Sequence, residues 1–160
     1  MATNFPSGIS VGGLPVVPGG GSIPATTGRT FFVNNNTVIG PTTGRGPSND
    51  NDGLSAETPL STLANAITRC TASRGDVIVV GPGHAETITT TLTPIAGSYI
   101  VGLGWGRLRP VFTGSGAIDV FTISAANVVL RNIVVVGAAA SVTALLEISG
   151  ADAQFYGVEL

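Results

Sequence analysis

One histidine lies two residues before a glutamate, and this pair is the first place in the chain where the residue types could do chemistry. His84 and Glu86 follow the apolar run VIVV at residues 77–80, after a Pro-Gly corner. General acid–base catalysis would need both side chains to face one substrate and a third group to orient the imidazole. Asp76 is the nearest other titratable group in the sequence. We interpret the pair as a structural corner and predict no catalytic residue.

Two further patterns resemble functional sites, but neither makes a convincing one. Asp119 and Glu147 could form the carboxylate pair of a polysaccharide-cleaving enzyme, but two outward groups on a solvated face are the commoner arrangement, and we interpret them so. The run Asn49–Gly53 opens like a calcium loop, but with Gly53 as the sixth position the twelfth is Pro59, where a bidentate glutamate is needed. We interpret this run as a polar turn.

The sequence contains no motif for binding a cofactor or a metal either. Gly102–Gly106 follows an apolar run, yet it lacks the GxGxxG spacing, and Arg109-Pro110 would block the helix that receives a pyrophosphate. Cys70 is the single cysteine, so the chain has neither an internal disulfide nor a thiolate set for zinc. We predict no cofactor and no metal.

The overall composition predicts a β-rich protein and excludes several partners. Only 10% of the 160 residues are charged, 23 are glycine, and the mean hydropathy is +0.44. All seven basic residues are arginines scattered along a chain of net charge -2, which argues against nucleic acid as a partner. The longest apolar tract, residues 133–146, is too short to span a bilayer, and the N-terminus lacks the basic region of a secretory signal.

The elements fall into an arm, a helix and a series of strands. Residues 1–28 are rich in glycine and proline, which predicts an extended arm preceding a domain at 29–160. Residues 58–70 have helical spacing, with Thr58 as N-cap and Pro59 as first helical residue. The arm carries apolar residues that a flexible linker would lack, and we expect it to dock on another surface. These candidate docking residues are Phe5, Ile9, Leu14, Val16 and Val17.

Short apolar runs follow the helix and recur at a common period. One ladder places Asp76, Ser98, Asn127 and Asp152 in register; a second aligns residues 86, 110, 132 and 157; a third aligns 118 with 144. Three strand positions sharing a period of about 25 residues predict a coil with three faces. The predicted fold is therefore all-β, a short right-handed parallel β-helix of about three rungs. The helix at 58–70 would cap its N-terminal end, and residues 157–160 end inside a strand pattern, which calls for either a covering neighbour or a longer natural chain.

Four stretches together resemble a known family: residues 48–67, then RGDVIVVGPGHAETI at 74–88, YIVGLGWGRLRPVFT at 99–113, and ISAANVVLRNIVVVG at 123–137. They are similar to the pectin-lyase-like right-handed parallel β-helix proteins, and more narrowly to those of tailed bacteriophages. The opening arm also resembles that of small phage virion proteins. This architecture hosts lyases, hydrolases, tailspikes and purely structural proteins, so the resemblance bears on fold more than on activity.

The resemblance implies a structural virion protein rather than an enzyme. We expect a capsid decoration (cement) protein on the capsid surface, present in many copies or as a homo-oligomer and bound to the major capsid protein or other virion subunits. The alternative is the N-terminal part of a trimeric, polysaccharide-degrading tailspike. Arg107 and Arg109, near Arg131 in the repeat alignment, are candidates for contact with an acidic patch on such a partner.

Overall fold

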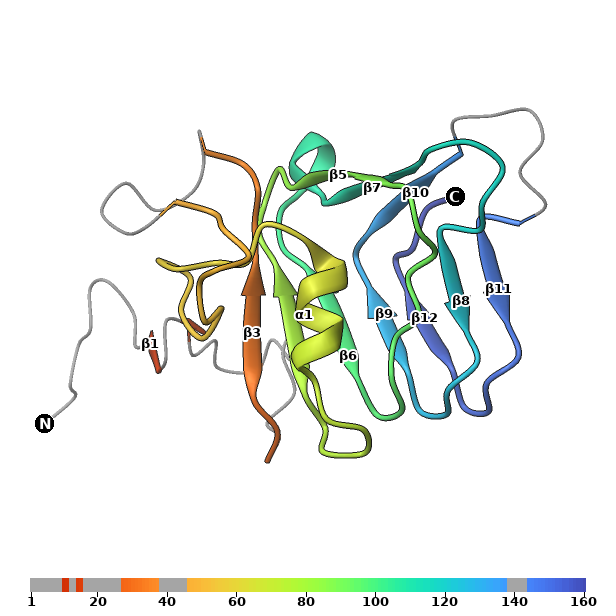
Figure 1. The fold of residues 1–160 in the computed structure, drawn as a ribbon, viewed down its shortest axis with the longest axis horizontal. Coiled ribbons are helices and arrows are strands. Elements are labelled where there is room, and N and C mark those ends of the chain that lie inside the picture. The colour runs from red at the N-terminus through yellow and green to blue at the C-terminus, as the bar shows by residue number, and fades with distance from the viewer. Residues whose placement is uncertain (1–9, 12–13, 16–26, 38–45, 138–143) are drawn as a thin grey trace, which may run out of the picture.

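Strands in parallel sheets dominate the computed structural model, which describes residues 10–11, 14–15, 27–37, 46–137 and 144–160 (Figure 1). A single α-helix, α1 (Leu63–Arg69), occurs among these residues. The all-β prediction is therefore confirmed. The strands are β1 (Ser10–Val11), β2 (Leu14–Pro15), β3 (Thr30–Val33), β4 (Val77–Val80), β5 (Ala85–Ile88), β6 (Tyr99–Gly102), β7 (Val111–Gly114), β8 (Phe121–Ile123), β9 (Val129–Arg131), β10 (Val134–Val136), β11 (Leu146–Ile148) and β12 (Gln154–Tyr156).

Three sheets of parallel strands make up the body. Their strand orders are β12-β9-β6-β4-β3, β10-β7-β5 and β11-β8. From β6 onward the chain visits these three sheets in a fixed order, and isolated bridges extend the two smaller ones, Leu92 to Phe121 and Val134 to Glu159. Each predicted run from residue 77 onward therefore forms a strand, and each strand pairs with one from a neighbouring turn of the chain.

Inward side chains of successive strands stack into one core. In the five-stranded sheet the register aligns Phe31, Ile78, Ile100, Leu130 and Phe155 in a single column. The first four of these side chains are buried, and they share one cluster with Phe112 and Phe121 from the other two sheets. The two phenylalanine rings meet edge to face at 5.7 Å. Branched and aromatic side chains at these positions hold the sheets together.

The predicted register is wrong by one or two residues in each ladder. Ser98 pairs at the level of Val128, not Asn127. Glu86 lies opposite Phe112 rather than Pro110, and Phe121 opposite Leu146 places residue 118 level with 143 rather than 144. The true repeat in the large sheet is a left-handed corner two residues before β4, β6, β9 and β12, with positive φ at Gly75, Gly97, Asn127 and Asp152. Glycine, asparagine and aspartate are the residues that tolerate this conformation.

The helix begins four residues later than predicted. Thr62 rather than Thr58 is the N-cap, and its hydroxyl accepts a hydrogen bond from the Asn65 N–H at 3.3 Å. Leu60 instead pairs with Val33, exchanging backbone hydrogen bonds with Phe32 and Asn34. This pairing covers the outer edge of β3, while α1 packs against β3 and β4 and buries Leu63, Ala66 and Ile67 (Figure 1).

The N-terminal arm falls mostly outside the described residues. Phe5, Ile9, Val16 and Val17 lie outside them, and Leu14 begins β2, which pairs antiparallel with β1. The expected docking role and the boundary at residue 28 stay predictions. Of the part of the chain that the structure describes, no helix is long and apolar enough to cross a bilayer.

Asp76 is a buried carboxylate at the start of β4 that joins three segments. It accepts hydrogen bonds from the backbone N–H groups of Arg29 and Thr71, and the Arg74 guanidinium contacts both its oxygens, each at 2.7 Å. Burial by itself would raise the pKa of this carboxyl, but the guanidinium and the two N–H groups outweigh it and hold the pKa below the ordinary 3.8. The ionised form is therefore part of the folded state.

Asp76→Asn should destabilise the fold by about 3 kcal/mol, because it removes the charge that Arg74 and two backbone donors face. Since the folded pKa lies below the unfolded one, this stabilisation is present above about pH 4 and is lost as pH falls through the folded pKa. Urea unfolding of wild type between pH 7 and pH 2 should show this acid loss, and the variant should show less of it. Asp152→Asn, at an exposed left-handed corner, is the matched control and should behave as wild type.

Candidate functional site

His84 and Glu86 lie inside the body, in direct contact with each other. The imidazole Nε2 is 3.0 Å from Glu86 Oε2, and Nδ1 accepts a hydrogen bond from the Asn35 N–H at 3.0 Å. Because Nδ1 is an acceptor, the ring carries its proton on Nε2 and donates it to the carboxylate. The His84 ring is fully buried and packs on Phe112, with ring centroids 5.5 Å apart.

Glu86 also receives the first N–H of α1. Its Oε2 accepts from Leu63 at 2.9 Å, at the N-terminal end of the helix, where a carboxylate is favourable. In the sheet register Glu86 occupies the inward position that Phe112 and Val135 fill in the later strands. The His84–Glu86 pair therefore holds three segments together: the residues that follow β3, the strand β5, and the start of α1. Both imidazole nitrogens are engaged and the ring has no access to solvent, so a substrate cannot reach it.

His84→Ala should cost about 2 to 3 kcal/mol of unfolding free energy, because it leaves the half-buried Asn35 N–H without its acceptor and opens a cavity beside Phe112. Glu86→Gln should cost much less, since the amide oxygen still accepts from Leu63 and from the imidazole. Chemical denaturation measures both, with Glu57→Ala on the surface as control. Equal losses for Glu86→Gln and His84→Ala would contradict this role.

The remaining groups considered for chemistry also have local partners. Glu147 lies opposite Thr122 and accepts from its hydroxyl at 3.3 Å, whereas Asp119 accepts from the Ala144 N–H at 3.0 Å. The register does not place the two carboxylates opposite each other. Asn49 Oδ1 accepts from the N–H groups of Ser61 and Thr62, so the polar run 49–53 secures the approach to α1. Within the described ranges, no three histidine, cysteine or acidic side chains gather as a metal would require.

Cys70 is a poor nucleophile in the folded chain. Burial and the nearby Asp76 charge raise the pKa of the thiol to about 12, and its Sγ lies 3.3 Å from the Ala66 carbonyl oxygen. The thiolate is the reactive form of cysteine, and it is scarce here at neutral pH.

Labelling of Cys70 by a disulfide reagent at pH 8 should be at least about a hundredfold slower in the native protein than in the unfolded chain, because the folded thiol ionises so rarely. Absorbance of the released thiol gives both rates. The same reaction in denaturant is the control, and comparable native and unfolded rates would show that the thiol is exposed and ionised.

The loop between β6 and β7 is the most distinctive surface feature. Corresponding connections comprise residues 81–84 after β4 and 132–133 after β9, whereas this one runs from 103 to 110. It contains the short 3-10 helix η1 (Gly106–Leu108), which stands out from the body in Figure 1. The fold closes the same corner elsewhere with half the residues or fewer, so the extra length is not needed for folding.

Specific contacts hold this loop in one shape. Asn132 donates to the carbonyl oxygens of Gly102 and Gly104 at 2.9 and 3.1 Å, and the Leu108 carbonyl accepts from the Gly83 N–H at 2.7 Å. Gly104 has a φ of +107, and a Cβ there would strike the Leu108 carbonyl oxygen. The loop is thus built to project its side chains rather than to swing freely.

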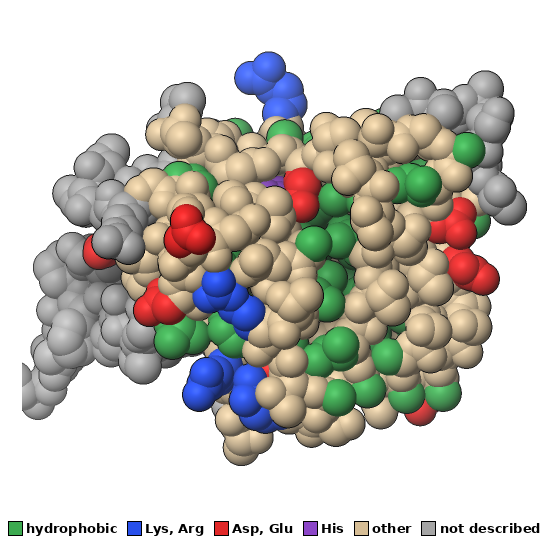
Figure 2. All heavy atoms as spheres, in the orientation of Figure 1, with side chains coloured by type: hydrophobic (Ala, Val, Ile, Leu, Met, Phe, Trp, Pro, Cys, Tyr) green, Lys and Arg blue, Asp and Glu red, His purple; other side chains and the backbone are tan. Residues whose placement is uncertain are grey.

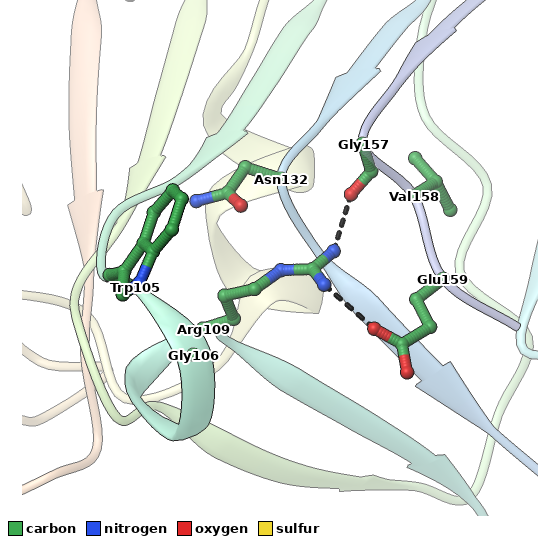
Figure 3. A pocket seen from close by; sticks show the side chains of 7 residues that line it. All are labelled: Trp105, Gly106, Arg109, Asn132, Gly157, Val158 and Glu159. Atoms are coloured by element: carbon green, nitrogen blue, oxygen red, sulfur yellow. Dashed lines mark hydrogen bonds and ion pairs between the residues drawn. The ribbon is translucent and has the colours of Figure 1, made fainter.

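Trp105 is the main side chain that the loop exposes. The only tryptophan of the chain is 90% exposed, Leu108 is 43% exposed, and Arg107 is also exposed. An open pocket of about 540 Å³ lies on one side, lined by Trp105, Gly106, Arg109, Asn132 and Gly157–Glu159 (Figure 3). A second hollow of about 400 Å³ shares Trp105 and is lined further by Val101–Gly104, Arg131, Asn132, Tyr156 and Gly157.

The two arginines predicted to meet a partner differ in their surroundings. Arg107 projects from the loop, while Arg109 is bound within the chain. Its guanidinium pairs with Glu159 Oε2 at 2.7 Å and donates to the carbonyl oxygens of Ile133 and Gly157 (Figure 3). The charge of Arg109 is therefore balanced locally, and Arg107 is the one whose charge faces outward.

A comparison with models of protein families, with curated proteins and with solved structures finds no match to this chain. Function must therefore be inferred from the geometry of the molecule.

The sequence excluded a dinucleotide loop at residues 102–106 but did not identify Trp105 as a candidate docking residue. One signal could have found it. The apolar runs at 99–103 and 110–113 are separated by more residues than the corresponding runs at 77–80 and 86–90 or at 127–130 and 132–136, and a lone tryptophan between two glycines lies in that excess.

Proposed function

We propose that this chain is a structural protein of a tailed-bacteriophage virion, a capsid decoration protein that binds the head shell and acts without catalysis. The observation that carries the proposal is the 103–110 loop, which is longer than the corresponding connections, is held by specific contacts and presents Trp105, Arg107 and Leu108 to solvent. Tryptophan and arginine are the residues most enriched where proteins bind each other tightly.

The proposal includes a specific architecture. We infer that the three parallel sheets are the faces of a short right-handed parallel β-helix, because the chain visits them in a constant order and pairs strand on strand. Such a body is stiff and repetitive, which suits a scaffold that carries a docking loop at one corner.

The arrangement of titratable groups supports a role without catalysis. His84 and Glu86 are used to join segments of the body, and Asp76 is paired with Arg74. On the face drawn in Figure 2 charged side chains are few and of both signs, with apolar side chains between them. A surface of this kind suits association with another protein better than steering of a charged ligand.

Decoration would stabilise the shell by mass action. A protein that binds the assembled lattice but not its loosened form shifts the equilibrium toward assembly, and many copies add avidity. Cryo-electron microscopy of purified virions tests the location. Copies spread over the head support decoration, whereas a few copies at the tail tip would favour the tailspike alternative.

Replacing Arg107 with Ala and Leu108 with Ser together should weaken binding to purified shells that lack this chain by at least about tenfold, because both side chains project from the loop tip. Co-sedimentation with shells measures the affinity. Leu54→Ser, at a similarly exposed leucine outside the loop, is the matched control and should bind as wild type. Unchanged binding of the loop variant would exclude the loop tip as the docking element.

A further inference from the structure

We propose that the two hollows beside Trp105 bind the proline-containing arm segment Leu14–Pro18 of a second copy of this chain. The inference rests on the proposed function in one respect, since it needs copies that lie side by side. It adds a site and an occupant that decoration alone does not specify.

The site is a raised aromatic ring with a depression on each side. Trp105 lines both hollows, and Asn132 and Gly157 lie in both linings. Val158 contributes apolar surface to the first, and Leu103 and Tyr156 to the second, where Tyr156 is 52% exposed. An extended segment laid across the indole would therefore place successive side chains in the two depressions.

The charges of the site favour a neutral occupant. Arg109 in the first hollow is paired with Glu159, and Arg131 in the second donates to the Tyr99 hydroxyl at 3.4 Å. An anionic ligand would meet the Glu159 carboxylate, and a cationic one would meet both guanidinium groups. Residues 1–28 carry no charged side chain at all, although Arg29 follows directly. The arm therefore matches the site in charge.

The arm also has two prolines at the spacing that aromatic-lined grooves bind. Pro15 and Pro18 are three residues apart, and a polyproline-II segment has three residues per turn, so both rings fall on one face. Such segments dock into aromatic-lined grooves and lose little entropy on binding because they are extended beforehand. Leu14 and Pro15 are extended here as β2, whose pairing with β1 spans two residues on each strand and would be marginal in isolation.

The described part of the arm lies away from the hollows: neither β1 nor β2 contributes a residue to the lining of either one. Leu14 and Pro15 of the same chain are therefore not the occupant, and a second copy would supply them. An arm passing from one copy to the corner of the next makes a heterologous contact, which links copies into a ring or an open array. Phe5 and Ile9, ahead of this segment, would remain available to the shell.

The single tryptophan gives a direct readout, since its emission moves to shorter wavelength when the indole leaves water. The experiment follows emission and sedimentation of the full chain over a concentration series. The test variant combines Pro15→Ala with Pro18→Ala, and Pro24→Ala is the matched control in the same arm. A synthetic peptide of residues 10–20 and a set of neutral oligosaccharides are then titrated into the test variant.

We expect wild type and Pro24→Ala to associate with a blue shift of Trp105, and the double proline variant to associate at least about tenfold more weakly. The peptide should restore the blue shift in that variant without causing association, and Tyr156→Ala should weaken peptide binding. The inference is overturned if emission is independent of concentration and peptide, if the double variant associates as wild type does, or if oligosaccharides shift the emission while the peptide does not. Shell binding that persists in any of these cases would leave decoration standing.

Discussion

In-register stacking of parallel strands is the constraint on which the rest of the molecule depends. Each strand of the large sheet takes its hydrogen bonds from the strand one turn away, so the column from Phe31 to Phe155 exists only if every turn keeps the same alignment. A slip by one residue would carry an inward side chain to the outer face. The apolar core, the left-handed corners and the position of each connecting loop all follow from this alignment.

The strands themselves could be predicted from the sequence, because short apolar runs between turn residues define them locally. Register could not, because it depends on connections of unequal length. The prediction aligned Asp76, Ser98 and Asn127 because all three are polar. In the structure Asn127 is level with Gly97 instead, and the two residues share a positive φ. Glycine and asparagine differ as side chains and agree only in tolerating a positive φ.

The start of α1 was predicted wrongly because strand pairing in the folded chain outweighs the local sequence preference for a helix. Thr58-Pro59 is a good helix start by itself, but Leu60 stabilises the edge of β3 by pairing with Val33, and this requires extended backbone. Thr62 then becomes the cap. The candidate site was missed for a related reason. Trp105 lies in a connection longer than the corresponding ones in other turns, and the strand pairing tells which connections correspond.

The distribution of polar groups explains why a docking role suits this body better than a chemical one. His84, Glu86 and Asp76 each bridge segments that are distant in sequence, and removing any one leaves a backbone N–H group without its acceptor. Groups so committed cannot also change position during a reaction without loosening the fold. The side chains of Trp105, Arg107 and Leu108 in the 103–110 connection have no such role, since they face solvent and shorter connections close the same corner in other turns. Variation in length and side chains is therefore tolerated there, and a rigid projection on a stiff scaffold binds with little loss of entropy.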